Sequence, residues 1–257
     1  MNNSLSSPER QDQILQILAR NQRISVAEIC ERFEVSEATA RRDLEALAEQ
    51  GKLQRVHGGA IALRQAPPEA PILQREREQA AEKIRIGLAA ASLVQDGETV
   101  FLGSGSTVLE AARALRTRAS LTVITNSLPV VNTLAGLENI QLICLGGMLR
   151  DSELSFIGHL TEQALAEVRA DKVLIGIRAV SLEHGLTNDY LPETMTDRAI
   201  LRAGREVILL ADHTKFGRVA AAHLAPLESV HTLVTDSQTP ADFLEAAHER
   251  GLRVITT

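Results

Sequence analysis

A chain of 257 residues with 44% hydrophobic side chains is long enough for two domains or for one large one. Its net charge of −6 argues against a protein that coats nucleic acid uniformly. The charge is unevenly spread, because residues 1–64 hold nine basic and nine acidic side chains and the remainder carries the whole excess of acid. A neutral N-terminal part on an acidic body is typical of binding to nucleic acid at one patch.

The sequence contains no signal for export or for a membrane. Its first residues are polar and lack the apolar centre of a signal peptide. No run of about 18 apolar residues is present to cross a bilayer. Cys30 and Cys144 both fall in apolar patterns, which predicts two buried, reduced thiols. We therefore expect a cytoplasmic protein without membrane contact.

The first 35 residues predict two short helices. Ser7-Pro8 fits the N-cap and first position of a helix, where proline loses no hydrogen bond. The second helix starts at Ser25, which has the spacing of a capping box with Glu28. A very short turn at Glu34-Val35 leads directly into a third helix. Three helices of which the last two nearly abut are typical of a helix-turn-helix.

The third helix is the predicted recognition helix. Ser36 is its expected N-cap and Gly51 its expected stop. Apolar residues at helical spacing form one stripe, namely Ala40, Leu44, Leu47 and Ala48. The side chains that we expect to face DNA, opposite this stripe or beside it, are those of Ser36, Ala38, Thr39, Arg41 and Arg42. Alone, this pattern also fits a surface helix with solvated arginines.

A basic hairpin follows this helix. No acidic residue lies between Gln50 and Arg64, and Gly58-Gly59 marks a tight turn. A short basic hairpin after such a helix is a wing, and we expect Arg55 and His57 in it to contact DNA phosphates or the minor groove. With a wing attached, DNA binding is favoured over a merely solvated helix.

Two separated clusters in this region resemble the DNA-binding domain of the DeoR family of bacterial sugar regulators. They are Ser36–Leu44 with Gly51, and Arg55–Ala60. Ala40 departs from the family pattern, which usually has a bulkier aliphatic residue there. The resemblance implies a winged helix-turn-helix domain over residues 1–63 that binds double-stranded operator DNA.

A linker and an α/β domain are predicted after the wing. Residues 64–74 include three prolines, which stiffen a chain towards polyproline II, and a helix is expected over Leu73–Leu93. Over residues 75–257, strands predicted from Thr99 onward are mostly continuous apolar runs, as in strands buried on both faces. These strands are Thr99–Leu102, Leu121–Thr125, Ile140–Leu145, Lys172–Ile177, Glu206–Ala211, Thr232–Thr235 and Arg253–Ile255. The crossover helices are expected at Thr107–Leu115, Leu128–Leu134, Thr161–Val168, Thr194–Ala203 and Pro240–Arg250. This alternation predicts an open, mostly parallel sheet.

Four polar sequences follow strands of this sheet, where ligands bind in such folds. They are Gly103–Thr107, Asn126-Ser127, Gly146-Gly147 and Asp212–Lys215. The first precedes a helix whose N-terminal amides favour a phosphate, but it matches neither a Walker loop nor a dinucleotide fingerprint. Each sequence alone also fits a turn, a helix cap or a surface ion pair. Their convergence favours one pocket, with ligand contacts from Ser104, Gly105, Ser106, Thr107, Asn126, Ser127, Gly146, Gly147, Asp212 and Lys215.

The same segments resemble the C-terminal sensor domain of the DeoR family over nearly its whole length. The matching pieces are Glu82-Lys83, Gly105–Thr107, Thr125–Ser127, Gly146-Gly147, Gly158, Asp171-Lys172, Gly185–Thr187 and Leu210–Phe216. That domain is similar in fold to ribose phosphate isomerase, so the resemblance implies a phosphosugar-isomerase-like α/β domain with a phosphorylated sugar as effector. Gly103 departs from the pattern, because many members have an aspartate there.

An enzyme is the main alternative function. Aldose–ketose isomerisation needs a carboxylate base, and the isomerase carries acids just after the strand that matches Val173–Ile177. This chain has no acid there until Glu183, and Asp197-Arg198 is the nearest match to the isomerase's Glu-Lys pair. The seven histidines are scattered, without metal-ligand spacing. We therefore expect no catalytic residue, no metal site and no cofactor.

An adaptor that uses a winged helix without DNA is a third possibility, against which the basic wing and Arg41-Arg42 argue. The favoured interpretation is a repressor of sugar-metabolism genes. We expect a homodimer or homotetramer, because helix-turn-helix proteins read paired half-sites.

Overall fold

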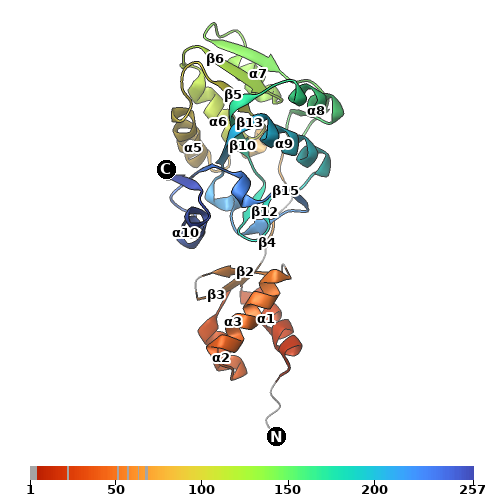
Figure 1. Ribbon diagram of the computed structural model, residues 1–257, viewed down its shortest axis with the longest axis vertical. Coiled ribbons are helices and arrows are strands. Elements are labelled where there is room, and N and C mark those ends of the chain that lie inside the picture. The colour runs from red at the N-terminus through yellow and green to blue at the C-terminus, as the bar shows by residue number, and fades with distance from the viewer. Residues whose placement is uncertain (1–4, 22, 51, 57, 63, 67–68) are drawn as a thin grey trace.

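The computed structural model describes residues 5–257, apart from 22, 51, 57, 63 and 67–68. Figure 1 shows two bodies, an N-terminal head and a larger α/β body above it. We call residues 5–62 the head, residues 64–78 the connector and residues 79–257 the body. The domain boundaries inferred from the sequence stay a prediction.

The head contains the three predicted helices. They are α1 (Ser7–Asn21), α2 (Val26–Phe33) and α3 (Glu37–Glu49). The predicted capping box starts α2, because the Ser25 side chain accepts from the Glu28 amide at 3.1 Å and the Glu28 carboxylate accepts from the Ser25 amide at 2.7 Å. The Ser36 hydroxyl accepts from the Thr39 amide at 3.3 Å and so caps α3. Local sequence therefore determines where both helices begin.

The predicted wing is present and has one strand more than expected. Strands β2 (Leu53–Val56) and β3 (Gly59–Ala62) form the hairpin, and β1 (Arg23–Ser25) pairs with β3 to give the order β1-β3-β2. A Cβ at Gly59 would lie 2.2 Å from the Ile24 carbonyl oxygen, so only glycine permits this close approach. The three strands close a small apolar core under the helices.

The body contains the predicted parallel sheet, in the order β17-β16-β13-β10-β5-β6-β7. The seven strands are β5 (Thr99–Leu102), β6 (Leu121–Thr125), β7 (Ile140–Cys144), β10 (Ala170–Gly176), β13 (Gly204–Leu210), β16 (Thr232–Thr235) and β17 (Arg253–Thr256). All six pairings are parallel, so all the carboxyl ends share one edge. This fold class is the one predicted.

Helices cover both faces of the sheet (Figure 1). They are α5 (Ala80–Ser92), α6 (Ser106–Leu115), α7 (Leu128–Leu134), α8 (His159–Ala166), α9 (Leu191–Ala203) and α10 (Ala241–Glu249). Val100 and Leu102 of β5 pack with α5, α6 and α7, whereas Phe101 packs with α8, α9 and α10. Burial on both faces explains why the strands are apolar throughout.

Two sequence predictions in the body were wrong. The helix expected over Leu73–Leu93 is two helices, α4 (Ile72–Arg75) and α5, because Gln79 adopts a left-handed conformation with φ of 49°. Cys144 is exposed, because it is the last residue of β7, and β7 is an edge strand with a neighbouring strand on one side only. Cys30 is half-buried.

Several short strands were not predicted. They are an antiparallel sheet of β11 (Ala179–Ser181), β12 (Gly185–Asn188) and β15 (Ala222–Ala225), a hairpin of β8 (Met148–Arg150) and β9 (Ser155–Ile157), and a parallel pair of β4 (Arg64–Gln65) and β14 (Arg218–Val219). The last pair fastens the connector to the body at the junction with the head (Figure 1). Among the described residues, no helix is long and apolar enough to cross a membrane.

Candidate functional site

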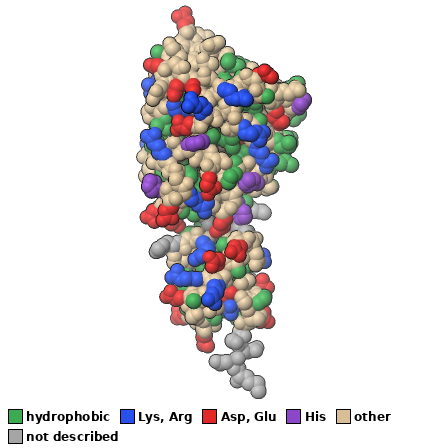
Figure 2. Space-filling model, in the orientation of Figure 1, with side chains coloured by type: hydrophobic (Ala, Val, Ile, Leu, Met, Phe, Trp, Pro, Cys, Tyr) green, Lys and Arg blue, Asp and Glu red, His purple; other side chains and the backbone are tan. Residues whose placement is uncertain are grey.

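The recognition helix presents the predicted polar face. Ser36, Ala38, Arg41 and Arg42 are exposed and Thr39 is half-buried. Arg41 forms an exposed ion pair with Glu37 at 3.2 Å, whereas Arg42 has no side-chain partner among the residues described. On the face shown in Figure 2, basic and acidic side chains are interleaved over both bodies.

A buried polar cluster fixes this helix against α1. Asp43 of α3 accepts from Arg10 Nε at 2.5 Å, from Ser7 Oγ at 2.7 Å and from Gln11 Nε2 at 3.1 Å. Burial opposes ionisation of Asp43, but the hydrogen bonds from Arg10, Ser7 and Gln11 outweigh it and lower its pKa. The charged carboxylate therefore sets the position of the face that carries Arg42.

The wing contacts the body. The backbone amide of Arg55 donates to Glu183 Oε1 at 3.1 Å, and the Arg55 side chain lies 3.7 Å from Glu45 of α3. The pKa of Glu183 is raised by burial. His57, the other wing residue predicted to contact DNA, lies outside the described residues. The head is thus docked on the body through β2.

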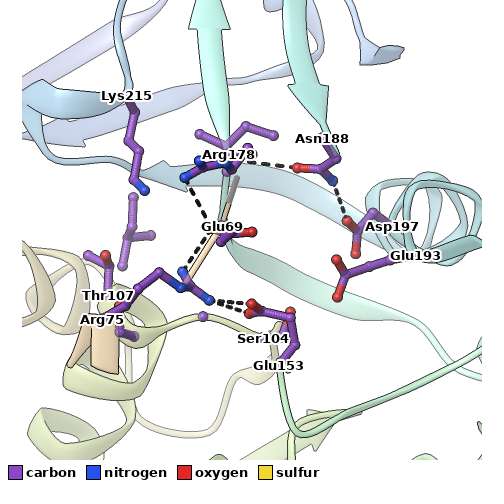
Figure 3. Close-up of a pocket in the computed structure, with 15 residues that line it drawn as sticks. Glu69, Arg75, Ser104, Thr107, Glu153, Arg178, Asn188, Glu193, Asp197 and Lys215 are labelled. Atoms are coloured by element: carbon purple, nitrogen blue, oxygen red, sulfur yellow. Dashed lines mark hydrogen bonds and ion pairs between the residues drawn. The ribbon is translucent and has the colours of Figure 1, made fainter. Parts of the chain in front are cut away.

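A charged pocket lies beyond the carboxyl ends of the central strands (Figure 3). It is lined by residues 104–107 after β5, residues 176–178 at the end of β10, Leu210 at the end of β13, and Lys215. The remaining lining residues are Glu69, Arg75, Glu153, Asn188, Glu193 and Asp197. The free volume of the pocket is small, about 40 Å³. This is the edge where the parallel sheet predicts a ligand.

Residues 104–107 form the start of α6. Gly105 is the N-cap with φ of 108°, a left-handed conformation that favours glycine, and Ser106 and Thr107 are buried. The first amides of a helix have no partner within it, and the helix dipole makes its N-terminus favourable for an anion. This loop is a suitable cradle for a phosphate.

Arg178 contributes a buried cation with unused hydrogen-bonding capacity. Its Nε donates to Asp189 at 2.8 Å and its Nη1 lies 3.6 Å from Glu69 Oε1. Its Nη2 is buried without a hydrogen-bond partner in the described part of the chain. An unpaired buried donor costs ~1–3 kcal/mol, so this nitrogen favours an acceptor brought by a ligand.

Arg75 and Lys215 are the other cations of the pocket. Arg75 Nη2 donates to both oxygens of Glu153 at 2.5 Å, its Nη1 lies 3.0 Å from Glu69, and its Nε donates to the Ala70 carbonyl at 2.8 Å. Lys215 is half-buried and points into the pocket (Figure 3), and burial lowers its pKa although the charge of Asp212 opposes this. The pocket therefore offers two planar guanidinium groups and one ammonium group to an anion.

Four carboxyl groups face these three cations, those of Glu69, Glu153, Glu193 and Asp197. Burial raises the pKa of Asp197 to about 7, although Asn188 Nδ2 donates to it at 2.8 Å. Glu193 forms an ion pair with Arg150 and accepts from Ser155 Oγ at 3.2 Å. The pocket thus contains at least as many acidic groups as basic ones.

Comparison with known proteins identifies both parts of the chain. The model of the DeoR-like helix-turn-helix domain matches residues 10–66, and that of the DeoR C terminal sensor domain matches residues 78–237. Transcriptional repressor AccR of Agrobacterium fabrum is 35% identical over 235 residues, which are 91% of each chain. The glycerol-3-phosphate regulon repressor of Escherichia coli is 32% identical over 97% of this chain and 99% of its own length.

The chain belongs to the DeoR family. It is therefore a transcriptional regulator that combines a DNA-binding helix-turn-helix domain with a sensor domain, as predicted from its sequence. Ribose 5-phosphate isomerase A of Methanocaldococcus jannaschii matches 54% of the chain and 55% of its own, with a TM-score of 0.40 and 21% identity. The β subunit of eIF2B from Chaetomium thermophilum matches 88% of the chain and 65% of its own, with a TM-score of 0.44 and 15% identity. Neither structural likeness bears on the function of this DeoR-family chain.

The pocket brings together only some of the residues predicted to bind effector. Ser104, Gly105, Ser106, Thr107 and Lys215 line it. Asp212 lies beside it, where its carboxylate accepts from the Thr214 amide at 3.0 Å and its charge acts on Lys215. The prediction that these residues bind effector remains a prediction.

Asn126, Ser127, Gly146 and Gly147 do not line this pocket. Asn126 Nδ2 donates to the Phe156 carbonyl at 2.9 Å, and the Gly146 carbonyl accepts from Thr161 Oγ1 at 2.9 Å. A Cβ at Gly147 would lie 2.1 Å from the same hydroxyl, so close packing explains that glycine. These residues follow β6 and β7, which are the outer strands on one side of the sheet, whereas the pocket follows β5, β10 and β13.

Ten of the fifteen residues that line the pocket were not predicted from the sequence to bind effector. Glu69 and Arg75 lie in the connector, and Glu153, Asn188 and Glu193 lie in or beside the small strands and α9. Only Arg178 carried a usable signal, because it directly follows the predicted strand Lys172–Ile177. Four carboxyl groups line the pocket, and the expectation that the chain has no catalytic residue stays a prediction.

Proposed function

We propose that this DeoR-family protein represses genes of sugar metabolism and is controlled by a phosphorylated sugar bound in the pocket. The phosphate binds the amides of residues 104–107 at the N-terminus of α6, with Lys215 and Arg178 as its cationic partners. Asp197, Glu193 and Asn188 supply polar groups for the sugar hydroxyls. The buried Nη2 of Arg178, which has no hydrogen-bond partner among the described residues, is the observation that carries this proposal.

Replacement of Lys215 tests the effector site. Lys215→Ala removes a point charge from the pocket, so a higher effector concentration is expected to be needed for the same change in operator binding. Operator binding in the absence of effector should equal that of wild type. The measurement is operator binding titrated with a panel of three- to six-carbon sugar phosphates.

Arg205→Ala is the matched control, because Arg205 is an exposed cation at the opposite end of β13 that pairs only loosely with Asp171, at 3.8 Å. It should change neither response. If Lys215→Ala switches at wild-type concentrations, the effector site is elsewhere. If it abolishes operator binding as well, the lysine has a structural role.

The body is expected to pair two or four heads, since paired half-sites need a homodimer or homotetramer. Large apolar side chains are exposed on it, including Leu88 on α5 and Leu191 and Met195 on α9. A fragment of residues 1–64 should be helical and bind operator DNA weakly at equal salt, because it loses the effective concentration that pairing provides. Full-length affinity from this fragment would contradict pairing through the body.

Asp197 supports one alternative, a sugar-phosphate isomerase. Its pKa of about 7 is suited to a general base. Incubation of the full chain with aldose and ketose phosphates, followed by product analysis, tests this alternative. We expect no interconversion with wild type, and conversion that is lost in Asp197→Asn would establish an enzyme.

A further inference from the structure

We propose that Glu69 of the connector occupies the position of an anionic ligand between Arg75 and Arg178, and that the effector displaces Glu69 and thereby releases the head. This inference rests on the proposed function, because it concerns how the same pocket is coupled to DNA binding. No residue of the connector was predicted to bind effector.

Glu69 lies between the two guanidinium groups of the pocket (Figure 3). Its Oε1 is 3.0 Å from Arg75 Nη1 and 3.6 Å from Arg178 Nη1. The three side chains are 13%, 9% and 7% exposed, so this contact is shielded from water. A carboxylate between two arginines is bound as a phosphate or a ligand carboxylate would be.

The two arginines of the pocket are already paired with carboxylates, so an entering anion competes with one of these carboxylates. Three cations already face four carboxyl groups, and a phosphate adds up to two further negative charges. Glu153 is held by both of its oxygens on Arg75, and Glu193 and Asp197 are fixed on α9. Glu69 is attached through one oxygen on a segment without a helix, so it is the group that can leave.

Displacement of Glu69 would act on the chain that carries the head. The connector is fastened to the body by the pairing of β4 with β14, where the Ala66 amide donates to the Val219 carbonyl at 3.0 Å. Further along the connector, the Ile72 amide donates to the Ser152 carbonyl at 2.8 Å. Strand β3 of the wing ends at Ala62, two residues before β4.

The partner strand is also linked to the pocket. Strand β14 begins three residues after Lys215, and β4 ends four residues before Glu69. Both strands of the pair therefore adjoin pocket-lining residues in the sequence. A ligand can shift an equilibrium only by its differential affinity for the two states. Competition with Glu69 supplies that difference, since the anion favours the state in which the connector has left.

Glu69→Gln in the full chain tests this coupling, with inorganic phosphate and the sugar-phosphate panel as probes. Glu76→Gln is the matched control, because it removes the same charge from the same connector but is paired with Arg113, outside the pocket. Hydrogen exchange at the Ala66 and Ile72 amides reports whether the connector is attached. Glu69→Ala is a second variant that removes the carboxylate entirely.

In wild type, a bound anion should accelerate exchange at both amides. Glu69→Gln should bind the anion at least about fivefold more tightly, the lower end of typical coupling between sites, and should exchange fast without it. Glu76→Gln should exchange like wild type and should bind the anion with wild-type affinity.

Slower exchange on anion binding would overturn the inference. Wild-type anion affinity and wild-type exchange in Glu69→Gln would also overturn it. If the anion binds wild type and Lys215→Ala weakens that binding, this result would leave the effector site in place and exclude only the displacement of Glu69. If no anion of the panel binds wild type, the proposed function fails and the inference fails with it.

Discussion

The head and the body each contain a buried cluster of arginine and carboxylate, and the two clusters are satisfied to different degrees. In the head, one carboxylate, Asp43, accepts three hydrogen bonds from α1, and they lower its pKa. In the pocket, four carboxyl groups face three cations, the pKa of Asp197 is raised to about 7, and Arg178 keeps a buried nitrogen without a partner in the described chain.

The difference separates a structural cluster from a binding site. A satisfied network stabilises one arrangement, because loss of any member leaves a buried charge behind. A network with an unused buried donor is better satisfied when a ligand brings an acceptor. The head cluster therefore fixes the recognition helix, whereas we propose that the charged groups of the pocket exchange partners when a ligand binds.

The largest effect is expected from breaking the head cluster. Asp43→Ala leaves Arg10 buried without its counter-ion and should destabilise the head by ~3–5 kcal/mol. Chemical denaturation followed by circular dichroism measures this loss. Glu37→Ala, which removes an exposed pair with Arg41 on the same helix, should change stability by less than about 1 kcal/mol. Equal effects of the two variants would contradict the distinction drawn between buried and exposed pairs.

The second-largest effect is expected at the polar face of α3, which this cluster positions. Arg42→Ala removes an exposed side chain without a partner among the described residues, and should weaken operator binding by roughly 1–3 kcal/mol if it reads a guanine edge. Its thermal stability should equal that of wild type. Arg20→Ala, an exposed arginine in the last turn of α1, is the control that should leave binding unchanged. Operator binding at physiological salt gives the answer, and wild-type affinity in Arg42→Ala would misplace the recognition face.

A smaller effect per pH unit is expected from the pocket. The ordinary pKa of an aspartate is 3.8, and burial raises that of Asp197 to about 7 in the folded chain. At a pH between these values, the folded chain holds a proton that the unfolded chain has released. Wild-type stability should therefore fall as pH rises through this window, by up to ~1.4 kcal/mol per pH unit. Asp197→Asn removes the titrating group and should flatten the profile.

Unfolding at pH 5, 6, 7 and 8 measures this slope. Asp151→Asn, an exposed carboxylate in the turn between β8 and β9, should keep the wild-type profile. An equally steep fall in Asp197→Asn would contradict a raised pKa of Asp197, because the slope would then come from other buried acids such as Glu183.

Local sequence determined the elements and the fold class. The capping box of Ser25 and Glu28 and the N-cap at Ser36 act within one helical turn, so their outcome needs no distant contact. The seven apolar runs predicted the seven strands because burial on both faces of a sheet demands them. The loop of residues 104–107, where we propose that phosphate binds, was also visible in the sequence, since the loop and the helix start are contiguous.

Only the tertiary structure decided which strand ends share a pocket and which distant charges enter it. The strand order places β6 and β7 away from the pocket, so Asn126 and Gly146 do not line the pocket that their positions after strands suggested. Glu69 and Arg178 are more than a hundred residues apart and meet because the connector folds back onto the body. Long-range ion pairs leave no period or spacing in a sequence, which is why the contact between Glu69 and Arg178 could be seen only in the folded chain.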